Sequence, residues 1–155
     1  MVFWYQNAGN VMADLVRISE ATTLAMHTMG LLARGGGERI TTDSIAETLS
    51  ASGHHLAKVM RRLVKAGLVD SHTGPSGGFL LRVPAEEIPM LRIFEVIEGP
   101  LNRDACLLRP SVCPGSACQL GNMVGKLQEQ LHTFLATTTL AEFACDSAPG
   151  RRKPL

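Results

Sequence analysis

The sequence is poor in aromatic residues and has almost no net charge. Phe, Trp and Tyr make up 5% of the 155 residues, and 15 Lys and Arg stand against 14 Asp and Glu, which leaves a formal charge of +1. A general binder of polyanions would be strongly basic, so this balance excludes that class. Any positive surface must be local. Hydrophobic residues still make up 45% of the chain, which is enough to bury a core.

Long apolar segments are absent as well. No apolar run reaches the length of about 18 residues that a transmembrane helix needs. Residues 1–7 lack the basic start and the long apolar stretch of a secretory signal peptide. We therefore expect a cytoplasmic protein with no membrane partner.

The sequence also lacks a pair of cysteines separated by two residues, the spacing of zinc knuckles and thioredoxin-like redox sites. Three of the four cysteines nevertheless crowd into thirteen residues that also hold Pro and Gly: Cys106, Cys113 and Cys118. In a reducing compartment such thiols rarely form structural disulfides, so metal ligation is the expected role. The wide, irregular gaps favour an iron–sulfur cluster over zinc, and inert thiols are the third interpretation.

Three thiolates leave such a cluster one ligand short. Several residues could supply the fourth ligand: Cys145, Asp104, Glu20, His27 or a residue of a partner subunit. Cys145 has a second interpretation as a buried core thiol. No arrangement of Cys, His and Asp typical of a nucleophilic active site is found, so no enzyme activity is predicted.

The most informative segment that is present runs from Ser50 to Gly67, where no Asp or Glu occurs. On a helix, four cations of this segment stack on one side, at positions i, i+3, i+4 and i+7: Lys58, Arg61, Arg62 and Lys65. Apolar residues fill the opposite side: Leu56, Val59, Met60 and Leu63. A basic helix face is often no more than a solvated face. Here it also suits the phosphate backbone of a duplex.

The segments on either side of this helix decide between the two interpretations. Thr41 or Thr42 can cap a short preceding helix, and residues 50–53 form a polar break in which Ser52 caps the basic helix. After it, two short apolar runs, 68–72 and 79–81, surround a Pro/Gly-rich tip and predict a β-hairpin. Short helix, tight turn, basic helix and hairpin is the order of a winged helix-turn-helix DNA-binding domain.

Three further helices are expected. The first begins after the Ser19 cap and ends at Gly35, the second spans Met90–Glu98, and the third spans Gln119–Thr137. Apolar residues of the third form a long stripe beyond a small winged domain, which favours dimerisation. The expected fold is mainly α with a small β-hairpin wing: a winged helix-turn-helix plus a long C-terminal dimerisation helix.

Four segments are expected along the chain. Residues 1–16 form an extension, either non-native or disordered, with packing of its aromatic residues on a neighbouring subunit as the alternative. Residues 17–83 form the DNA-binding domain. Residues 84–146 hold a linker helix, the cysteine loop and the dimerisation helix, and residues 147–155 form a disordered tail.

Several of these segments resemble the IscR/NsrR/RirA-type regulators, the Rrf-two family. The resemblance covers roughly residues 17–143. It is carried by the cysteine trio and by five blocks: Arg17–Ser19, Ser50–Val59, Lys65–Val69, Gly74–Leu81 and Thr139–Phe143. It implies a dimeric winged-helix transcription factor. In many members a two-iron or four-iron cluster senses iron supply, cluster status, nitric oxide or redox stress.

The chain departs from the family pattern at three positions. Gly121 stands where one subgroup has a histidine ligand, and Thr23 stands where another has an aspartate ligand on the first helix. Neither fourth ligand carries over. Thr73 replaces the arginine that many members have before the Gly-Pro of the wing, with His72 as a substitute.

The function expected from these observations is a homodimeric regulator that binds a double-stranded DNA operator, with an affinity modulated by an iron–sulfur cluster. The metal ligands would be Cys106, Cys113 and Cys118. The DNA contacts would be Ser52, His54, His55, Lys58, Arg61, Arg62, Lys65, Thr73, Gly74, Pro75, Ser76 and Gly77. Two alternatives stay open: a regulator that signals through thiol oxidation or a partner protein, and a metal-handling or redox protein.

Overall fold

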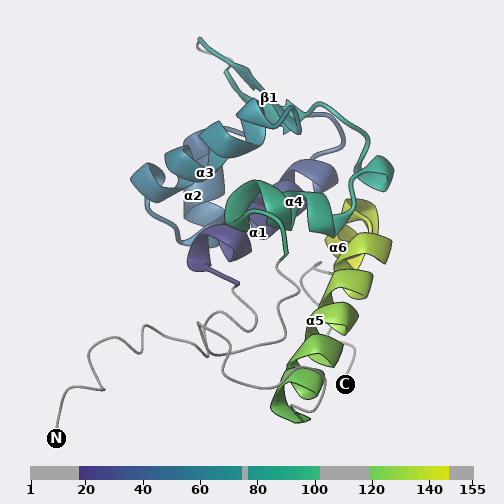
Figure 1. The fold of residues 1–155 in the computed structure, drawn as a ribbon. Coiled ribbons are helices and arrows are strands. Elements are labelled where there is room, and N and C mark those ends of the chain that lie inside the picture. The colour runs from purple at the N-terminus through teal and green to yellow at the C-terminus, as the bar shows by residue number, and fades with distance from the viewer. Residues whose placement is uncertain (1–17, 75–76, 102–118, 147–155) are drawn as a thin grey trace, which may run out of the picture. The chain divides into compact units, whose positions relative to one another are not determined.

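A computed structural model describes residues 18–74, 77–101 and 119–146 (Figure 1). The chain divides into two compact units. The larger unit comprises Ile18–Pro100 and Phe134–Leu155, and the smaller comprises Met1–Arg17 and Leu101–Thr133. Each is described by itself below.

The described residues form helices and one short antiparallel hairpin, as expected. In chain order the elements are α1 (Glu20–Arg34), α2 (Thr42–Leu49), α3 (Gly53–Lys65), β1 (Val69–His72), β2 (Gly78–Leu81), the 3-10 turn η1 (Ala85–Glu87), α4 (Met90–Glu98), α5 (Gln119–Thr137) and α6 (Leu140–Asp146). The predicted fold class, mainly α with a small β-hairpin wing, is confirmed. No helix in the described ranges combines the length and apolar character needed to cross a membrane.

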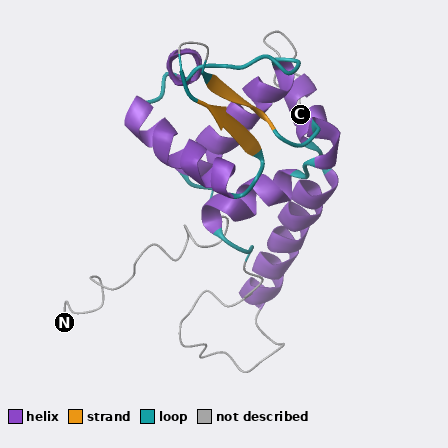
Figure 2. Ribbon diagram, turned by 90° about the horizontal axis from the view of Figure 1, so that it is seen from above, coloured by secondary structure: helices purple, strands orange, loops and turns teal. Residues whose placement is uncertain are grey.

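Helix α1 is the centre of the larger unit. It contacts α2, α3, α4, α6 and β2, and its residues Ala25 and Met29 are completely buried (Figure 1). Helix α3 adds four buried side chains to this core: Leu56, Val59, Met60 and Leu63. The two strands are seen side by side over the helices in Figure 2. The winged helix-turn-helix is thus built around the first helix.

Three helices begin at the caps that the sequence predicts. The hydroxyl groups of Ser19, Thr41 and Ser52 accept hydrogen bonds from backbone N–H groups three residues later, over 3.2, 3.2 and 3.1 Å. Each bond satisfies a donor that the first helical turn leaves without a partner. The Ser52 cap therefore fixes where the turn between α2 and α3 ends and α3 begins.

The hairpin pairs Val69 with Leu81 and His72 with Gly78 at its two ends. A third extended segment joins it, because Ile40 forms an antiparallel bridge with Phe79. Its N–H and carbonyl groups exchange hydrogen bonds of 3.0 and 2.9 Å with Phe79. Ile40, which directly precedes the N-cap of α2, therefore anchors the wing to the helical body.

Helix α6 and turn η1 are not among the predicted elements. Thr139 and Glu142 form a capping box at the start of α6: the Thr139 N–H donates to Glu142 Oε2 over 2.8 Å, and the Glu142 N–H donates to Thr139 Oγ1 over 3.3 Å. Helix α6 packs against α1 and carries Cys145, which is exposed. The interpretation of Cys145 as a core thiol is wrong, because the apolar face of α6 is formed by Leu140 and Ala144.

Candidate nucleic-acid interface

The cations of α3 form an exposed ridge. Lys58, Arg61, Arg62 and Lys65 are all exposed, while Leu56, Val59, Met60 and Leu63 are buried in the core. This division follows from helical spacing, because residues three and four apart share a face. The predicted helix, with one basic face and one apolar face, is confirmed. The ridge presents four positive charges to solvent, and no acidic residue occurs within α3.

The first turn of α3 exposes its polar residues as well. Ser52 and His54 are exposed, and His55 is 32% exposed. Because the Ser52 side chain accepts the His55 N–H, the backbone of this turn is held in place before any ligand binds. These three residues lie where helix-turn-helix proteins contact base edges.

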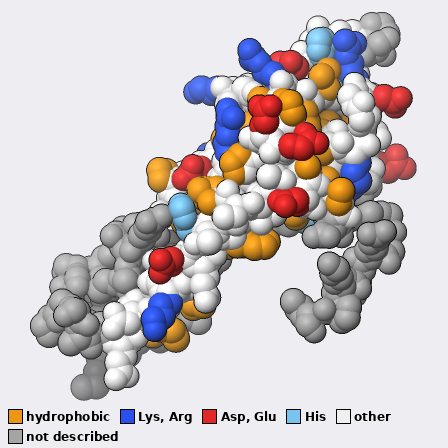
Figure 3. Space-filling model, turned by 90° about the vertical axis from the view of Figure 1, so that its right-hand side faces the viewer, with side chains coloured by type: hydrophobic (Ala, Val, Ile, Leu, Met, Phe, Trp, Pro, Cys, Tyr) orange, Lys and Arg blue, Asp and Glu red, His pale blue; other side chains and the backbone are white. Residues whose placement is uncertain are grey.

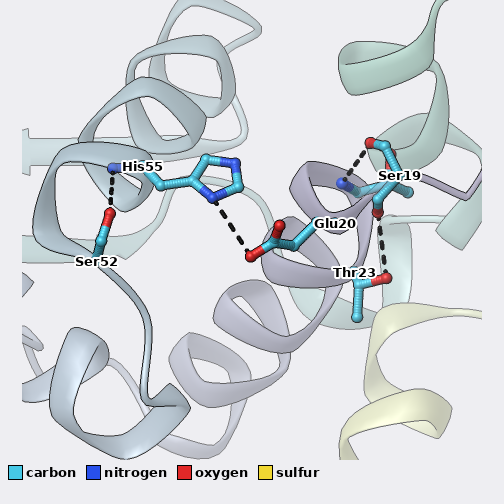
Figure 4. A network of polar contacts seen from close by, with 6 residues as sticks. Ser19, Glu20, Thr23, Ser52 and His55 are labelled. Atoms are coloured by element: carbon cyan, nitrogen blue, oxygen red, sulfur yellow. Dashed lines mark hydrogen bonds and ion pairs between the residues drawn. The ribbon is translucent and has the colours of Figure 1, made fainter.

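A contact between α1 and α3 escaped the sequence prediction. The Nδ1 atom of His55 lies 3.8 Å from Oε1 of Glu20, in the first turn of α1 (Figure 4). Glu20 is 90% exposed, so water screens the pair and its contribution to stability is small. The two residues are 35 positions apart, and no periodic pattern could have indicated that they meet.

A second polar contact connects α1 to α4. The Ser19 N–H donates to Glu98 Oε1 over 3.0 Å, and the hydroxyl of the buried Thr22 donates to the same oxygen. Charge-assisted hydrogen bonds of this kind are stronger than neutral ones. They fix the start of α1, the helix on which α3 packs.

The hairpin tip is described in part. Thr73 and Gly74 are exposed and Gly77 is half-buried, while Pro75 and Ser76 lie outside the described residues. Figure 1 shows the hairpin projecting from the body beyond α3. Figure 3 shows Lys and Arg side chains towards the upper edge of that view and Asp and Glu mainly below them. Helix α3 contacts β1, so the helix that carries the ridge and the hairpin are neighbours in the larger unit.

The predicted metal ligands cannot be placed in the same way, because Cys106, Cys113 and Cys118 lie outside the described residues. Within the described ranges, no group of three His, Cys, Asp or Glu side chains could hold a metal ion. Of the open candidates for a fourth ligand, Glu20 and His27 line one hollow of about 260 Å³ beside the end of α2. The Nδ1 of His27 donates to the Thr23 carbonyl over 2.8 Å, because a carbonyl can only accept, and Nε2 stays available.

Helix α5 exposes part of its apolar stripe. Leu120, Met123 and Leu127 are 51%, 50% and 41% exposed, and Phe134 near the end of the helix is 60% exposed. Val124 and Leu135 of the same helix are buried. The predicted apolar stripe thus includes both exposed and buried side chains. Large exposed apolar side chains at helical spacing are typical of a surface that meets another protein.

Known proteins resemble this chain in both sequence and fold. The Rrf2 family, described as iron-dependent transcriptional regulators, matches residues 18–146. The IscR regulator of Serratia proteamaculans, an HTH-type transcriptional regulator, is 32% identical over 98 residues, which cover 63% of this chain and 60% of that protein.

Among solved structures, CymR, the global cysteine regulator of B. subtilis, is 26% identical with a TM-score of 0.71, covering 85% of this chain and 98% of CymR. The IscR of T. potens has a TM-score of 0.69 over 90% of this chain and 93% of its own, and at 23% identity it supports the fold alone. Because the family match spans most of the chain and agrees with the capped α3, its exposed cations and the hairpin, the chain belongs to the Rrf2 family of transcriptional regulators.

Proposed function

We propose that the protein is a homodimeric regulator that binds double-stranded DNA with α3 in the major groove and the β1–β2 hairpin on the neighbouring minor groove. Ser52, His54 and His55 would contact base edges. The hairpin tip, Thr73–Gly77, would contact the minor groove or its phosphates. The observation that carries the proposal is the exposed ridge of Lys58, Arg61, Arg62 and Lys65 above a fully buried apolar face.

The ridge makes a specific prediction for salt dependence. Each phosphate contact contributes about 0.9 to the slope of log affinity against log salt concentration, because it releases a condensed counterion. Arg61→Gln and Arg62→Gln should each lower that slope by about this amount. The measurement is fluorescence anisotropy with duplexes of about 30 base pairs, long enough for two half-sites one helical turn apart.

The matched control is Lys126→Gln on α5, an exposed cation outside the proposed interface. It should leave the slope unchanged. If the α3 variants behave like this control, the groove contact by α3 is refuted. A loss that is equal for all duplex sequences identifies phosphate contacts, whereas a loss confined to one sequence identifies base contacts.

We also propose that Cys106, Cys113 and Cys118 hold an iron–sulfur cluster that modulates operator affinity. The proposal is supported by three thiols in one Pro/Gly-containing loop and by the description of the family as iron-dependent. Thiolates are the ligands that such clusters prefer, and a bound cluster would supply a redox-sensitive and iron-sensitive group. The nuclearity and fourth ligand stay open, with Glu20 and His27 facing one hollow as candidates of this chain.

The test is anaerobic reconstitution with iron and sulfide, followed by absorption spectroscopy and metal analysis. Wild type should show broad bands between about 320 and 460 nm, and Cys113→Ser should lose them; a loss of the bands in Cys145→Ser would identify Cys145 as the fourth ligand. Coupling of about 1–3 kcal/mol would change operator affinity about 5–150-fold between the two forms. Equal operator affinities with and without the cluster would refute the sensing role and leave only the proposal of DNA binding.

A second candidate keeps DNA binding and replaces the cluster by thiol chemistry. It is favoured by the likeness to a structure of Staphylococcus aureus CymR in an oxidized form, 30% identical over 83% of this chain. Cys145 is exposed and therefore accessible to oxidants. If operator affinity changes with peroxide in the iron-free protein and Cys145→Ser abolishes the change, this candidate replaces the first.

A further inference from the structure

The hairpin has the wrong charge for an element that lies on DNA. Between Val69 and Leu81 there is no Lys or Arg, and Asp70 is the one residue of this segment that is charged at neutral pH when His72 is neutral. A duplex carries one phosphate charge about every 1.7 Å along its axis, so a segment with a net negative charge is repelled. If the hairpin approaches DNA, a cation beside it would offset this repulsion.

Arg39 lies beside the hairpin. It precedes Ile40, whose N–H and carbonyl groups are bonded to Phe79 over 3.0 and 2.9 Å in the first half of β2. A Cβ atom built on Gly78 would lie 3.4 Å from the Cβ of Arg39 and 2.8 Å from the Ile40 carbonyl oxygen. Arg39 itself is exposed. Its side chain therefore starts at the tip-side end of β2, where Gly78 pairs with His72.

Gly78 is the reason that the two segments approach so closely. Its φ of +152° and the 2.8 Å separation both disfavour a side chain at this position. The glycine lets the backbone of residues 39 and 40 lie directly against the strand. The close approach joins a cationic residue from outside the hairpin to the hairpin's outer end.

We propose that Arg39 provides the positive charge of the wing and contacts the DNA backbone beside the groove in which the hairpin lies. The inference rests on the proposed DNA binding and adds a contact residue that lies outside both α3 and the hairpin. Because Ile40 ties the segment to β2, the guanidinium group and the hairpin approach the duplex as one body. Arginine suits this contact, because its planar donors match phosphate oxygens and it is always charged.

The contact should be energetically separate from the α3 ridge. Arg39 and the α3 cations belong to different elements and would meet different phosphates, so their effects on affinity should add. The double variant Arg39→Gln/Arg62→Gln should therefore lower the salt slope by about twice 0.9. Arg39 is exposed, and circular dichroism together with urea denaturation shows whether each variant keeps the wild-type fold.

The experiment compares three variants of the full chain on a duplex recovered by wild-type protein from a random library of about 30 base pairs. Arg39→Gln should weaken binding several-fold at low salt and lower the salt slope by about 0.9. Arg39→Lys, which keeps the charge, should retain most of the slope. The matched control is Arg34→Gln, five positions earlier, whose Nη1 donates to the Ala144 carbonyl on α6 over 3.4 Å; it should bind like wild type.

The outcomes separate this inference from the proposal on which it rests. A normal slope for Arg39→Gln, together with lowered slopes for Arg61→Gln and Arg62→Gln, overturns the role of Arg39 and leaves DNA binding by α3. Normal slopes for all three overturn both. Equal losses in Arg39→Gln and Arg34→Gln would show a general charge effect and would also overturn the assignment of Arg39.

Discussion

At the scale of single residues, the helix N-caps each satisfy a backbone donor with one short side chain. Ser52 and Thr41 accept equivalent hydrogen bonds on α3 and α2, over 3.1 and 3.2 Å. Both are exposed, so neither contributes to the core. The difference between them lies in position: the Ser52 cap orders the turn that would face base edges, and the Thr41 cap does not.

This difference gives a matched pair of variants. Ser52→Ala and Thr41→Ala should each lower the free energy of unfolding by about 1 kcal/mol, measured by urea denaturation, because each leaves one N–H donor without its side-chain partner. Only Ser52→Ala should additionally weaken DNA binding in conditions where both proteins are fully folded. Equal DNA affinities for the two variants would show that the first turn of α3 takes no part in recognition.

Glu142 makes stability depend on pH. Hydrogen bonds from the backbone and side chain of Thr139 lower the pKa of its carboxyl group below the ordinary value of 4.5. A carboxyl group with a lowered pKa stabilises the fold above the ordinary pKa, and that contribution disappears as the pH falls through the folded-state pKa. Glu142→Gln should lose this component of acid sensitivity below pH 4.5 in urea titrations. An acid profile identical to wild type would contradict the assignment.

At the scale of elements, sequence patterns predicted most of the helices and turns whose start and stop signals lie in neighbouring residues. The bounds of Met90–Glu98 and Gln119–Thr137 are as predicted, because Pro89, Gly99 and apolar spacing are local signals. Helix α6 escaped prediction although its capping box of Thr139 and Glu142 is a local signal, because seven residues are too few to show an apolar period. The Ile40–Phe79 bridge escaped because a one-residue pairing has no period.

The wing offers a test of the close approach at Gly78. Gly78→Ala should lower the free energy of unfolding by at least about 1 kcal/mol, because the φ of +152° disfavours a side chain and the new methyl group would meet the Ile40 carbonyl at 2.8 Å. Gly53→Ala is the control: a Cβ there meets nothing within 4 Å, and alanine favours a helix. If both variants are equally stable, the hairpin is not held against Ile40.

At the scale of the whole molecule, the sequence of one chain predicts only part of the candidate site. The α3 ridge could be predicted because its cations follow one another along a helix. The pairing of α1 with α3 through Glu20 and His55 could not, because it depends on how two helices cross. Two copies of the chain are needed for the proposed operator contact, and the exposed apolar residues of α5 are the surface on which they would meet.

Adjacent positions on α5 test this assembly. Leu127→Glu should yield a monomer in sedimentation velocity at concentrations where wild type is a dimer, because it places a charge on the exposed apolar stripe. Lys126→Glu, one residue earlier and exposed on the polar side, should remain a dimer. A dimer for both variants, or a monomer for wild type, would refute α5 as the dimer surface.

The contact of α6 with α1 has a consequence for how the protein is made. The larger unit is interrupted at Pro100 and resumes at Phe134, so its first and last helices come from opposite ends of the chain. On the ribosome, α1 stays uncovered on its α6 side until residues 134–146 have been synthesised. A product that stops before residue 134 lacks α6 and therefore leaves apolar surface of α1 exposed, which favours aggregation and proteolysis.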